Sequence, residues 1–404
     1  MSAQVSGDIL FLAHRVPWPP DRGDKIRGYH LLRHLGERAR VHLVAFADDA
    51  ADMGATAALA DLAVSTMIIP RTKSRARAAV EALAQGRPVS LTAFADPRVT
   101  AAVEAVTSRT PVGRVFVFSG QMAQHVPAGH APVMDFVDVD SAKFADYARA
   151  ARWPLRWLYA REARLLGAYE RRVAQAATAS LFVSDAEAAL FSNLGGIGRI
   201  VAVENGIDTD FFDPAAHFDP VAADGPLIVF TGQMDYPPNI EAVRWFARDI
   251  LPLVRRRHPD AGFAIVGRQP GEAVRALARL PGVTVTGAVA DVRGWLAAAA
   301  VVVAPLRIAR GVQNKVLEAM AMARPVVAST EAATGIDHAG TLRVGAGATR
   351  IAGAIGDLLD DPAIAVALGQ AARRRVQTRY AWPARLAPLD DLLGLALAAA
   401  DAAA

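Results

Sequence analysis

The sequence predicts an α/β protein with two doubly wound parallel sheets, one in each half of the chain. Three observations support this prediction. Short apolar runs alternate with segments of helical periodicity, the alternation is interrupted once and then begins again, and 404 residues suffice for two domains. Strands of a parallel sheet are covered by helices on both faces, which explains why the apolar runs are continuous rather than alternating.

In the N-terminal half, an apolar run over residues 8–13 is followed by a proline-rich loop and by a helical pattern over 25–35. Further strands are expected at 41–46, 67–69, 115–118 and 132–137, with helical segments such as 75–85 and 99–108 between them.

In the C-terminal half the pattern restarts after residues 208–226, a stretch with several prolines and acidic residues that suits a linker. Strands are expected at 227–230, 262–266, 283–286, 300–304 and 325–328, and helices at 240–254, 291–299 and 315–322. A last helix is expected at about 388–400, with Pro388 in its first turn.

Composition excludes several classes of protein. The absence of cysteine excludes disulfide frameworks, thiolate metal sites and cysteine nucleophiles, and fits a reducing compartment. A net charge of +4, from 44 basic and 40 acidic residues, is too small for a general nucleic-acid binder. No apolar run approaches the length of a membrane span, and the first residues do not resemble a signal peptide. We therefore expect a cytoplasmic protein that makes at most peripheral contact with a membrane.

The densest chemical signal is the segment 311–328, in which a glycine-containing turn leads directly into a helix that carries Lys315 and Glu318. A helix N-terminus offers unpaired N–H groups that suit a phosphate, and a carboxylate one turn further along can accept hydrogen bonds from ribose hydroxyls. The alternative is an exposed helix on which these two side chains form an ordinary ion pair.

The loop 14–27 of the first half is a second candidate. Gly23 lies just before the helix expected at 25–35, so the backbone there can approach a ligand closely at a helix N-terminus. The alternative is a proline-rich loop followed by a solvated basic helix start.

Several segments resemble the family 4 glycosyltransferases, which are retaining, metal-independent enzymes of GT-B fold. The resemblance rests on VLEAM at 316–320, PVVAS at 325–329, VENGID at 203–208, FTG at 230–232, IVG at 265–267 and VTG at 285–287. More narrowly, the pieces LAHRVPWPPDRGDKIR, DFVDVDSAKFADYA, TGQMDYPPNIEAVRWF and NKVLEAMA resemble the sugar transferases associated with exosortase (PEP-CTERM) exopolysaccharide systems.

The resemblance implies two Rossmann-like domains facing across a cleft. We expect an acceptor domain at 1–210, a nucleotide-sugar domain at 211–383 and a C-terminal helix within 384–404 that crosses back to the first domain. No metal or other cofactor is expected. We expect the catalytic residues to be Lys315, Glu318 and Asp138. We expect the sugar donor to be bound by Gly23, Asp24, Gly232, Gln233, Asn239, Gly267, Gly287, Arg310, Gly311, Gln313 and Asn314.

Two departures from the family pattern concern charge. The family has a glutamate eight positions before the equivalent of Glu318, where this chain has Arg310. It also commonly has an arginine and a lysine after the first glycine of the second domain, whereas Gly232 is followed here by QMDYPPN. Because a departing diphosphate needs positive charge, we expect Lys315, with Arg310 or Arg307, to supply it.

Asp135, Asp138 and Asp140 lie in or just after the strand expected at 132–137. Three carboxylates near the carboxyl end of a strand are costly unless they are used. By register, Asp138 lies near the position at which the family has a histidine that contacts the transferred sugar, so a role toward sugar hydroxyls or the acceptor is expected. The alternative is capping of the next helix by Asp140 or Ser141.

The segment 143–172 contains eight basic and three acidic residues among tryptophans, tyrosines and leucines. One interpretation is contact with an anionic membrane surface. The other is a solvated helix whose aromatic side chains pack inward.

The residues and the resemblance together predict a glycosyltransferase that moves a sugar from a nucleotide-diphosphate sugar to a saccharide acceptor, lipid-linked or oligosaccharide. The resemblance further implies retention of configuration and a role in exopolysaccharide synthesis. Two alternatives stay open: a non-catalytic nucleotide-sugar-binding assembly subunit and a nucleotide-sugar epimerase. A dehydrogenase is disfavoured because no G-x-G-x-x-G follows an expected strand.

Overall fold

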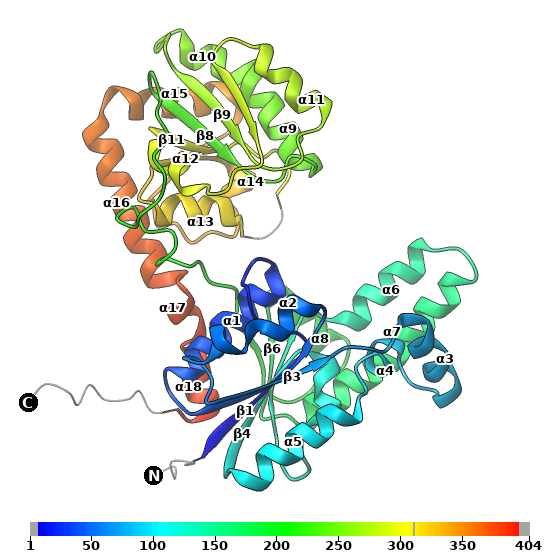
Figure 1. The fold of residues 1–404 in the computed structure, drawn as a ribbon. Coiled ribbons are helices and arrows are strands. Elements are labelled where there is room, and N and C mark those ends of the chain that lie inside the picture. The colour runs from blue at the N-terminus through cyan, green and yellow to red at the C-terminus, as the bar shows by residue number, and fades with distance from the viewer. Residues whose placement is uncertain (1–6, 310–311, 396–404) are drawn as a thin grey trace, which may run out of the picture. The chain divides into compact units, whose positions relative to one another are not determined.

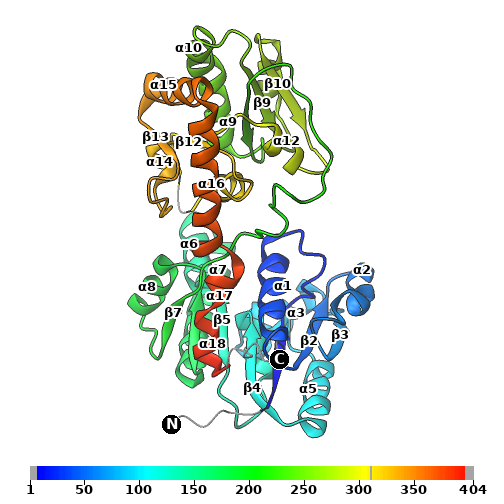
Figure 2. The same cartoon turned by 90° about the vertical axis from the view of Figure 1, so that its left-hand side faces the viewer.

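The computed structural model describes residues 7–309 and 312–395. The chain divides into two compact units (Figures 1 and 2). The first joins the residues up to Asn205 with those from Arg385 onward, and the second spans Gly206–Ala384.

The first unit is built on a seven-stranded parallel sheet of order β3-β2-β1-β4-β5-β6-β7. The strand Asp8–Ala13 (β1) pairs with both of its neighbours in parallel register, for example Ile9 with Val41 and Leu12 with Val117. The strands are β1 Asp8–Ala13, β2 Val41–Ala47, β3 Ser65–Pro70, β4 Val112–Phe118, β5 Val133–Val137, β6 Ala179–Phe182 and β7 Ile200–Ala202. Every residue of β2 is buried, as expected for a strand with helices on both faces.

Helices connect these strands. They are α1 Gly23–Gly36, α2 Ala50–Met53, α3 Arg75–Gln85, α4 Val89–Thr92, α5 Pro97–Arg109, α6 Asp140–Ala150, α7 Leu155–Ala176 and α8 Asp185–Asn193, with 3-10 turns at Gly54–Leu59 and Gly120–His125. Helices α6 and α7 pack side by side as a hairpin that extends away from the sheet (Figure 1).

The second unit repeats the plan with a six-stranded parallel sheet of order β10-β9-β8-β11-β12-β13. Its strands are β8 Leu227–Thr231, β9 Gly262–Val266, β10 Val283–Gly287, β11 Val301–Ala304, β12 Val326–Ser329 and β13 Arg343–Gly345. Its helices are α9 Pro237–Trp245, α10 Leu251–Arg255, α11 Glu272–Arg275, α12 Arg293–Ala298, α13 Asn314–Ala321, α14 Thr330–Ala333, α15 Gly347–Asp360 and α16 Pro362–Arg379, with a 3-10 turn at Ala276–Arg279. The buried faces of helices and strands meet in one apolar core that includes Phe230, Phe246 and Phe263.

The predicted fold class is confirmed, because both units are α/β with a doubly wound parallel sheet. The predicted helix 240–254 differs in detail: α9 and α10 are separated by a π-helical turn at Phe246–Ile250. Pro252 has no N–H to continue the helical ladder, which explains the interruption. Residues 208–226 are all described, and none of them lies in a helix or strand.

After α16 the chain forms α17 Trp382–Leu386 and α18 Pro388–Leu393. Asp390 in α18 is hydrogen-bonded to His34 and makes an ion pair with Arg38, both at 2.9 Å. Residues 396–400 of the predicted last helix lie outside the described residues. Within the described part of the chain, none of the helices is long and apolar enough to span a bilayer.

Candidate functional site

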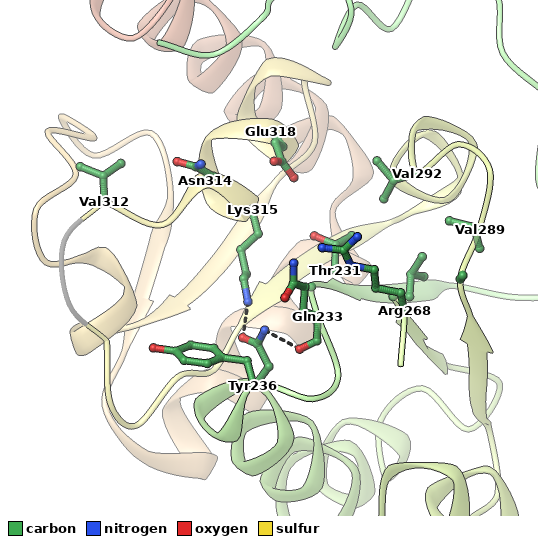
Figure 3. A pocket seen from close by; sticks show the side chains of 15 residues that line it. Thr231, Gln233, Tyr236, Arg268, Val289, Val292, Val312, Asn314, Lys315 and Glu318 are labelled. Carbon is green, nitrogen blue, oxygen red and sulfur yellow. Dashed lines mark hydrogen bonds between the residues drawn. The ribbon is translucent and has the colours of Figure 1, made fainter. Parts of the chain in front are cut away.

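A pocket of about 600 Å³ lies in the second unit, at the carboxyl ends of β8, β9 and β10 and at the N-terminus of α13 (Figure 3). Ligands of doubly wound sheets bind at this edge, next to the point where the strand order reverses. Seven of the predicted residues line the pocket, namely Gly232, Gln233, Asn239, Gly267, Asn314, Lys315 and Glu318.

The three predicted strand-end glycines lie at the ends of neighbouring strands, and two of them, Gly232 and Gly267, line the pocket. The Gly232 N–H donates to the Val266 carbonyl at 3.0 Å, and the Gly267 N–H donates to the Gly287 carbonyl at 3.2 Å. A Cβ on Gly267 would collide with the carbonyl oxygen of Gly232. Glycine is therefore required at Gly267 by the close approach of two strand ends.

Lys315 reaches from α13 to the start of α9, next to the loop that follows β8. Its Nζ donates to Asn239 Oδ1 at 2.5 Å and lies 4.3 Å from the centre of the Phe230 ring. Asn239 in turn donates through Nδ2 to the Gln233 carbonyl at 2.8 Å (Figure 3). The ammonium therefore lies beside the loop in which the resembling family carries its cations.

Glu318 lies one helical turn after Lys315 and also faces the pocket (Figure 3). Burial raises the pKa of Glu318 to about 7, although the charge of Lys315 opposes this shift. Burial likewise lowers the pKa of Lys315 to about 8, against the charge of Glu318. Both side chains are partly buried, and shifted pKa values of this kind are common among the groups of functional sites.

Arg268, Thr231 and Tyr236 also line the pocket, although the sequence reasoning did not single them out. Arg268 projects into the pocket from the residue that follows Gly267 (Figure 3), and no ion pair to its guanidinium is found among the described residues. The Thr231 hydroxyl is buried and has no hydrogen-bond partner in the described part of the structure. The sequence signal for Thr231 and Arg268 was their position at a strand end, next to the glycines of FTG and IVG.

Arg307 does not line this pocket. Arg307 contacts Glu241 at 3.2 Å and stacks on Trp245 at 5.8 Å, in a separate pocket of about 420 Å³. Gln313 occupies the N-cap position of α13. Arg310 and Gly311 lie outside the described residues.

A second pocket, of about 490 Å³, lies in the first unit at the carboxyl ends of β1, β4, β5 and β6. The predicted residues Gly23, Asp24 and Asp138 line it. Gly23 begins α1, and a Cβ placed on it would meet nothing within 4 Å, so there is open space next to this backbone.

Asp24 lies among basic side chains at the start of α1. It pairs with Arg15, and its Oδ2 is 3.5 Å from His14 Nε2. Burial, with the charge of Arg15, lowers the pKa of His14 to about 4. His14 is therefore neutral at pH 7 and offers a ring nitrogen rather than a positive charge to this pocket.

Asp135 has a structural role. It is fully buried and accepts a hydrogen bond from Arg27 Nε at 2.8 Å, while Arg27 Nη1 donates to Asn205 at 2.9 Å. Asp135 also accepts from the Val137 N–H at 3.0 Å, which fixes Val137 at a φ of 71°. A β-branched residue rarely adopts this conformation, so the strand end is held in a strained turn just before Asp138.

Asp138 is bound to Lys143, whose Nζ donates to it at 2.7 Å and to Asp140 at 3.3 Å. Helix capping by Asp140 or Ser141 is not observed, because Val139 is the N-cap residue and makes no side-chain cap. The N–H groups of Val139 and Ser141 instead donate to Glu187 and Glu170, at 2.7 and 3.1 Å. Those two carboxylates come from α8 and α7.

Within the segment 143–172, the aromatic and leucine side chains differ in burial. Leu166 and Tyr169 are buried, whereas Trp153 and Trp157 are exposed.

Comparison with known proteins supports the resemblance in the second unit. Residues 225–361 match the family model of the glycosyl transferases group 1. A phosphatidyl-myo-inositol mannosyltransferase of Mycobacterium tuberculosis (strain CDC 1551 / Oshkosh) is 36% identical over 78 residues. That alignment spans 19% of this chain and only 20% of the mycobacterial protein.

Solved structures extend the likeness to both units. A glycosyltransferase from Rickettsia africae ESF-5 has a TM-score of 0.62 at 14% identity, covering 96% of this chain and 97% of its own. Anabaena Alr3699/HepE, in complex with UDP and glucose, has a TM-score of 0.58 at 15% identity, covering 96% of this chain and all of its own, 100%. The chain therefore has the two Rossmann-like sheets of GT-B glycosyltransferases.

Proposed function

We propose that the chain is a glycosyltransferase that binds a nucleoside-diphosphate sugar in the pocket of its second unit and transfers the sugar to a hydroxyl of a saccharide acceptor. The observation that carries the proposal is the placement of Lys315, Arg268 and Glu318 around one pocket at the ends of β8, β9 and α13. The match of residues 225–361 to glycosyl transferases group 1 supports it.

Each group has a distinct part in holding the sugar donor. The Glu318 carboxylate would accept hydrogen bonds from two ribose hydroxyls. Lys315 and Arg268 would neutralise the diphosphate, together with the N–H groups at the start of α13. Asn239, Gln233 and Asn314 would add neutral hydrogen bonds, while Gly232, Gly267 and Gly287 keep the strand ends close together.

In this proposal Arg268 takes the role that the sequence analysis gave to Arg307. Arg307 lines a different pocket, so it does not accompany Lys315 in this one. Arg268 meets the need for a second positive charge, because negative charge develops on the diphosphate as the sugar leaves and must be met by fixed groups. In this proposal no metal ion is required.

The acceptor would bind in the pocket of the first unit, near Gly23, Asp24 and Asp138. The protein would orient the acceptor hydroxyl toward the anomeric carbon, and its proton would pass to the departing diphosphate as the new glycosidic bond forms. Retention of anomeric configuration follows from the resemblance to family 4. A lipid-linked acceptor of exopolysaccharide synthesis is the finer form of the proposal, and the mycobacterial relative is itself named for a lipid acceptor.

Incubation of the purified protein with a panel of nucleotide sugars and a lipid extract tests this function. We expect release of nucleoside diphosphate that depends on the extract and is insensitive to a metal chelator. Binding without release would indicate an assembly subunit, and conversion of the sugar donor without acceptor would indicate an epimerase. Either result contradicts the proposal.

Variants test the assignment of charge. Lys315→Ala and Arg268→Gln should each lower kcat/KM for the sugar donor by roughly 100-fold. The matched control Arg307→Gln, in the same unit but another pocket, should change it by less than about twofold. Equal effects of Arg268→Gln and Arg307→Gln would remove Arg268 from the site.

A further inference from the structure

The tip of the α6–α7 hairpin exposes a group of large apolar side chains. Trp153 is 83% exposed, and Trp157, Tyr147 and Leu155 are each more than half exposed. These four residues, which we call the hairpin tip, belong to the end of α6, the turn after it and the first turn of α7. Such side chains are rarely left together in water without a partner.

The charge around the hairpin tip has one sign. Residues 147–161 contain four arginines and no acidic residue. Arg152 and Arg156 are exposed, and neither has an ion-pair partner within residues 7–309 and 312–395. Arg149 pairs with Asp146, and Arg161 turns back toward the body of the unit, where it donates to the carbonyls of Ala82 and Arg87 at 3.0 Å each.

The hairpin is held firmly behind its tip. Buried Glu162 in α7 accepts hydrogen bonds from the N–H groups of Val89 and Ser90 at 2.8 Å, which caps α4. Between the two helices, Tyr147 packs against Tyr159 with ring centres 5.8 Å apart, and Phe144 contacts both. The tip therefore stays exposed as a fixed surface.

We propose that the hairpin tip inserts into the interface of a lipid bilayer that contains anionic headgroups. Tryptophan and tyrosine favour this depth because their rings are apolar and their polar edges stay hydrated. Arg152 and Arg156 flank the aromatic residues and complement the negative surface. The inference goes beyond the proposed sugar transfer, because it rests on none of the residues of either pocket.

Sedimentation of the full-length protein with vesicles tests it. We expect binding to vesicles of phosphatidylcholine with about 30% of the anionic lipid phosphatidylglycerol. Binding should be weaker to phosphatidylcholine alone and should be lost as the salt concentration is raised. Arg152→Gln with Arg156→Gln should reduce partitioning roughly 30-fold. Trp153→Ser with Trp157→Ser should reduce it by roughly tenfold or more, whereas Trp153→Phe with Trp157→Phe should retain most of it.

Matched controls come from the second unit. Arg275→Gln with Arg279→Gln removes two exposed arginines at the same spacing, and Ile364→Ser with Val366→Ser removes two exposed apolar side chains. Neither pair should change partitioning. The proposal would be overturned if the wild-type protein did not bind anionic vesicles. It would also be overturned if hairpin and control variants, all with a normal circular dichroism spectrum, lost vesicle binding to the same extent. A protein that binds no vesicles but still transfers sugar would leave the proposed function intact.

Discussion

At the scale of single residues, Glu318 and Lys315 are unlike ordinary surface charges. The rise of the Glu318 pKa from 4.5 to about 7 corresponds to roughly 3 kcal/mol of lost stabilisation for its ionised form. This penalty applies fully above pH 7 and disappears below pH 4.5, because the folded state binds its proton more tightly than the unfolded state does. A nucleotide that hydrogen-bonds the carboxylate would offset the penalty.

The same pair predicts a bell-shaped pH dependence for binding of the sugar donor. Affinity should fall below about pH 7 as Glu318 gains a proton, and above about pH 8 as Lys315 loses one. Titration calorimetry at pH values from about 5.5 to about 9.5 would measure this affinity, with the nucleotide sugar that the panel assay selects as the ligand. The diphosphate diester of that nucleotide sugar keeps its charge over this range. The Glu318→Gln variant should bind the sugar donor more weakly. Its affinity should no longer fall at low pH, whereas the fall above about pH 8 should remain. A flat profile between about pH 6 and 9 would contradict the assignment of both groups.

The sequence predicted Lys315 and Glu318 because both belong to one contiguous motif with helical spacing. It did not predict Arg268, because the residue lies 47 positions before Lys315 and only the pairing of β8 with β9 brings it to the same pocket. For Asp135 the sequence suggested a functional carboxylate that the structure does not support. Its carboxylate looked available, but Arg27, distant in sequence, neutralises it in the core.

At the scale of elements, the Arg27–Asp135 pair joins α1 to β5. Both side chains are almost completely buried, at 1% and 0% exposure. Burial of two charges is costly, and the attraction between them offsets the cost only while both are present. The pair therefore fixes where α1 lies on the sheet, and with it the position of Gly23 and Asp24 at the helix start.

Arg27→Met should destabilise the first unit by about 3–5 kcal/mol, because it leaves the Asp135 carboxylate buried without a partner. Urea unfolding followed by circular dichroism would measure this loss. The double variant Arg27→Met with Asp135→Leu should recover most of it, since no buried charge remains. Arg77→Met, at an exposed helical pair, serves as the control and should cost less than about 0.5 kcal/mol. A cost for Arg27→Met as small as that of the control would show that the pair is not stabilising.

Burial alone did not decide which strands were predicted, because β6 is buried throughout and was not predicted. Strand β1 matches its predicted range because an uninterrupted apolar run lies between polar residues. Strand β13 was not predicted, since Arg343 and Val344 are exposed on a three-residue edge strand. In α7 the helical period was visible, but which side of it would stay uncovered depends on packing against α4 and α6.

At the scale of the whole molecule, the chain passes from the first unit to the second after Asn205 and returns after Ala384. On the second-unit side, the Ile207 N–H donates to the Tyr380 carbonyl at 2.7 Å. On the first-unit side, Glu204 pairs with Arg385 at 2.6 Å. The outgoing segment, residues 204–207, and the returning segment, residues 380–385, therefore contact each other on both sides of the boundary. We call these two segments together the connection between the units.

Gly206 is the tightest point of this connection, because a Cβ there would lie 2.6 Å from the backbone N and Cα of Trp382. Gly206→Ala should separate the two segments and destabilise the second unit by about 1–3 kcal/mol. Differential scanning calorimetry would show the lower Tm, and limited proteolysis should cut earlier near the two segments. Gly271→Ala, where a Cβ meets nothing within 4 Å, should stay within about 0.5 kcal/mol of wild type. Because the pocket residues from Thr231 to Glu318 lie outside both segments, nucleotide-sugar affinity below the Tm should be retained. If instead affinity falls while stability is unchanged, Gly206 acts on the pocket rather than on the connection.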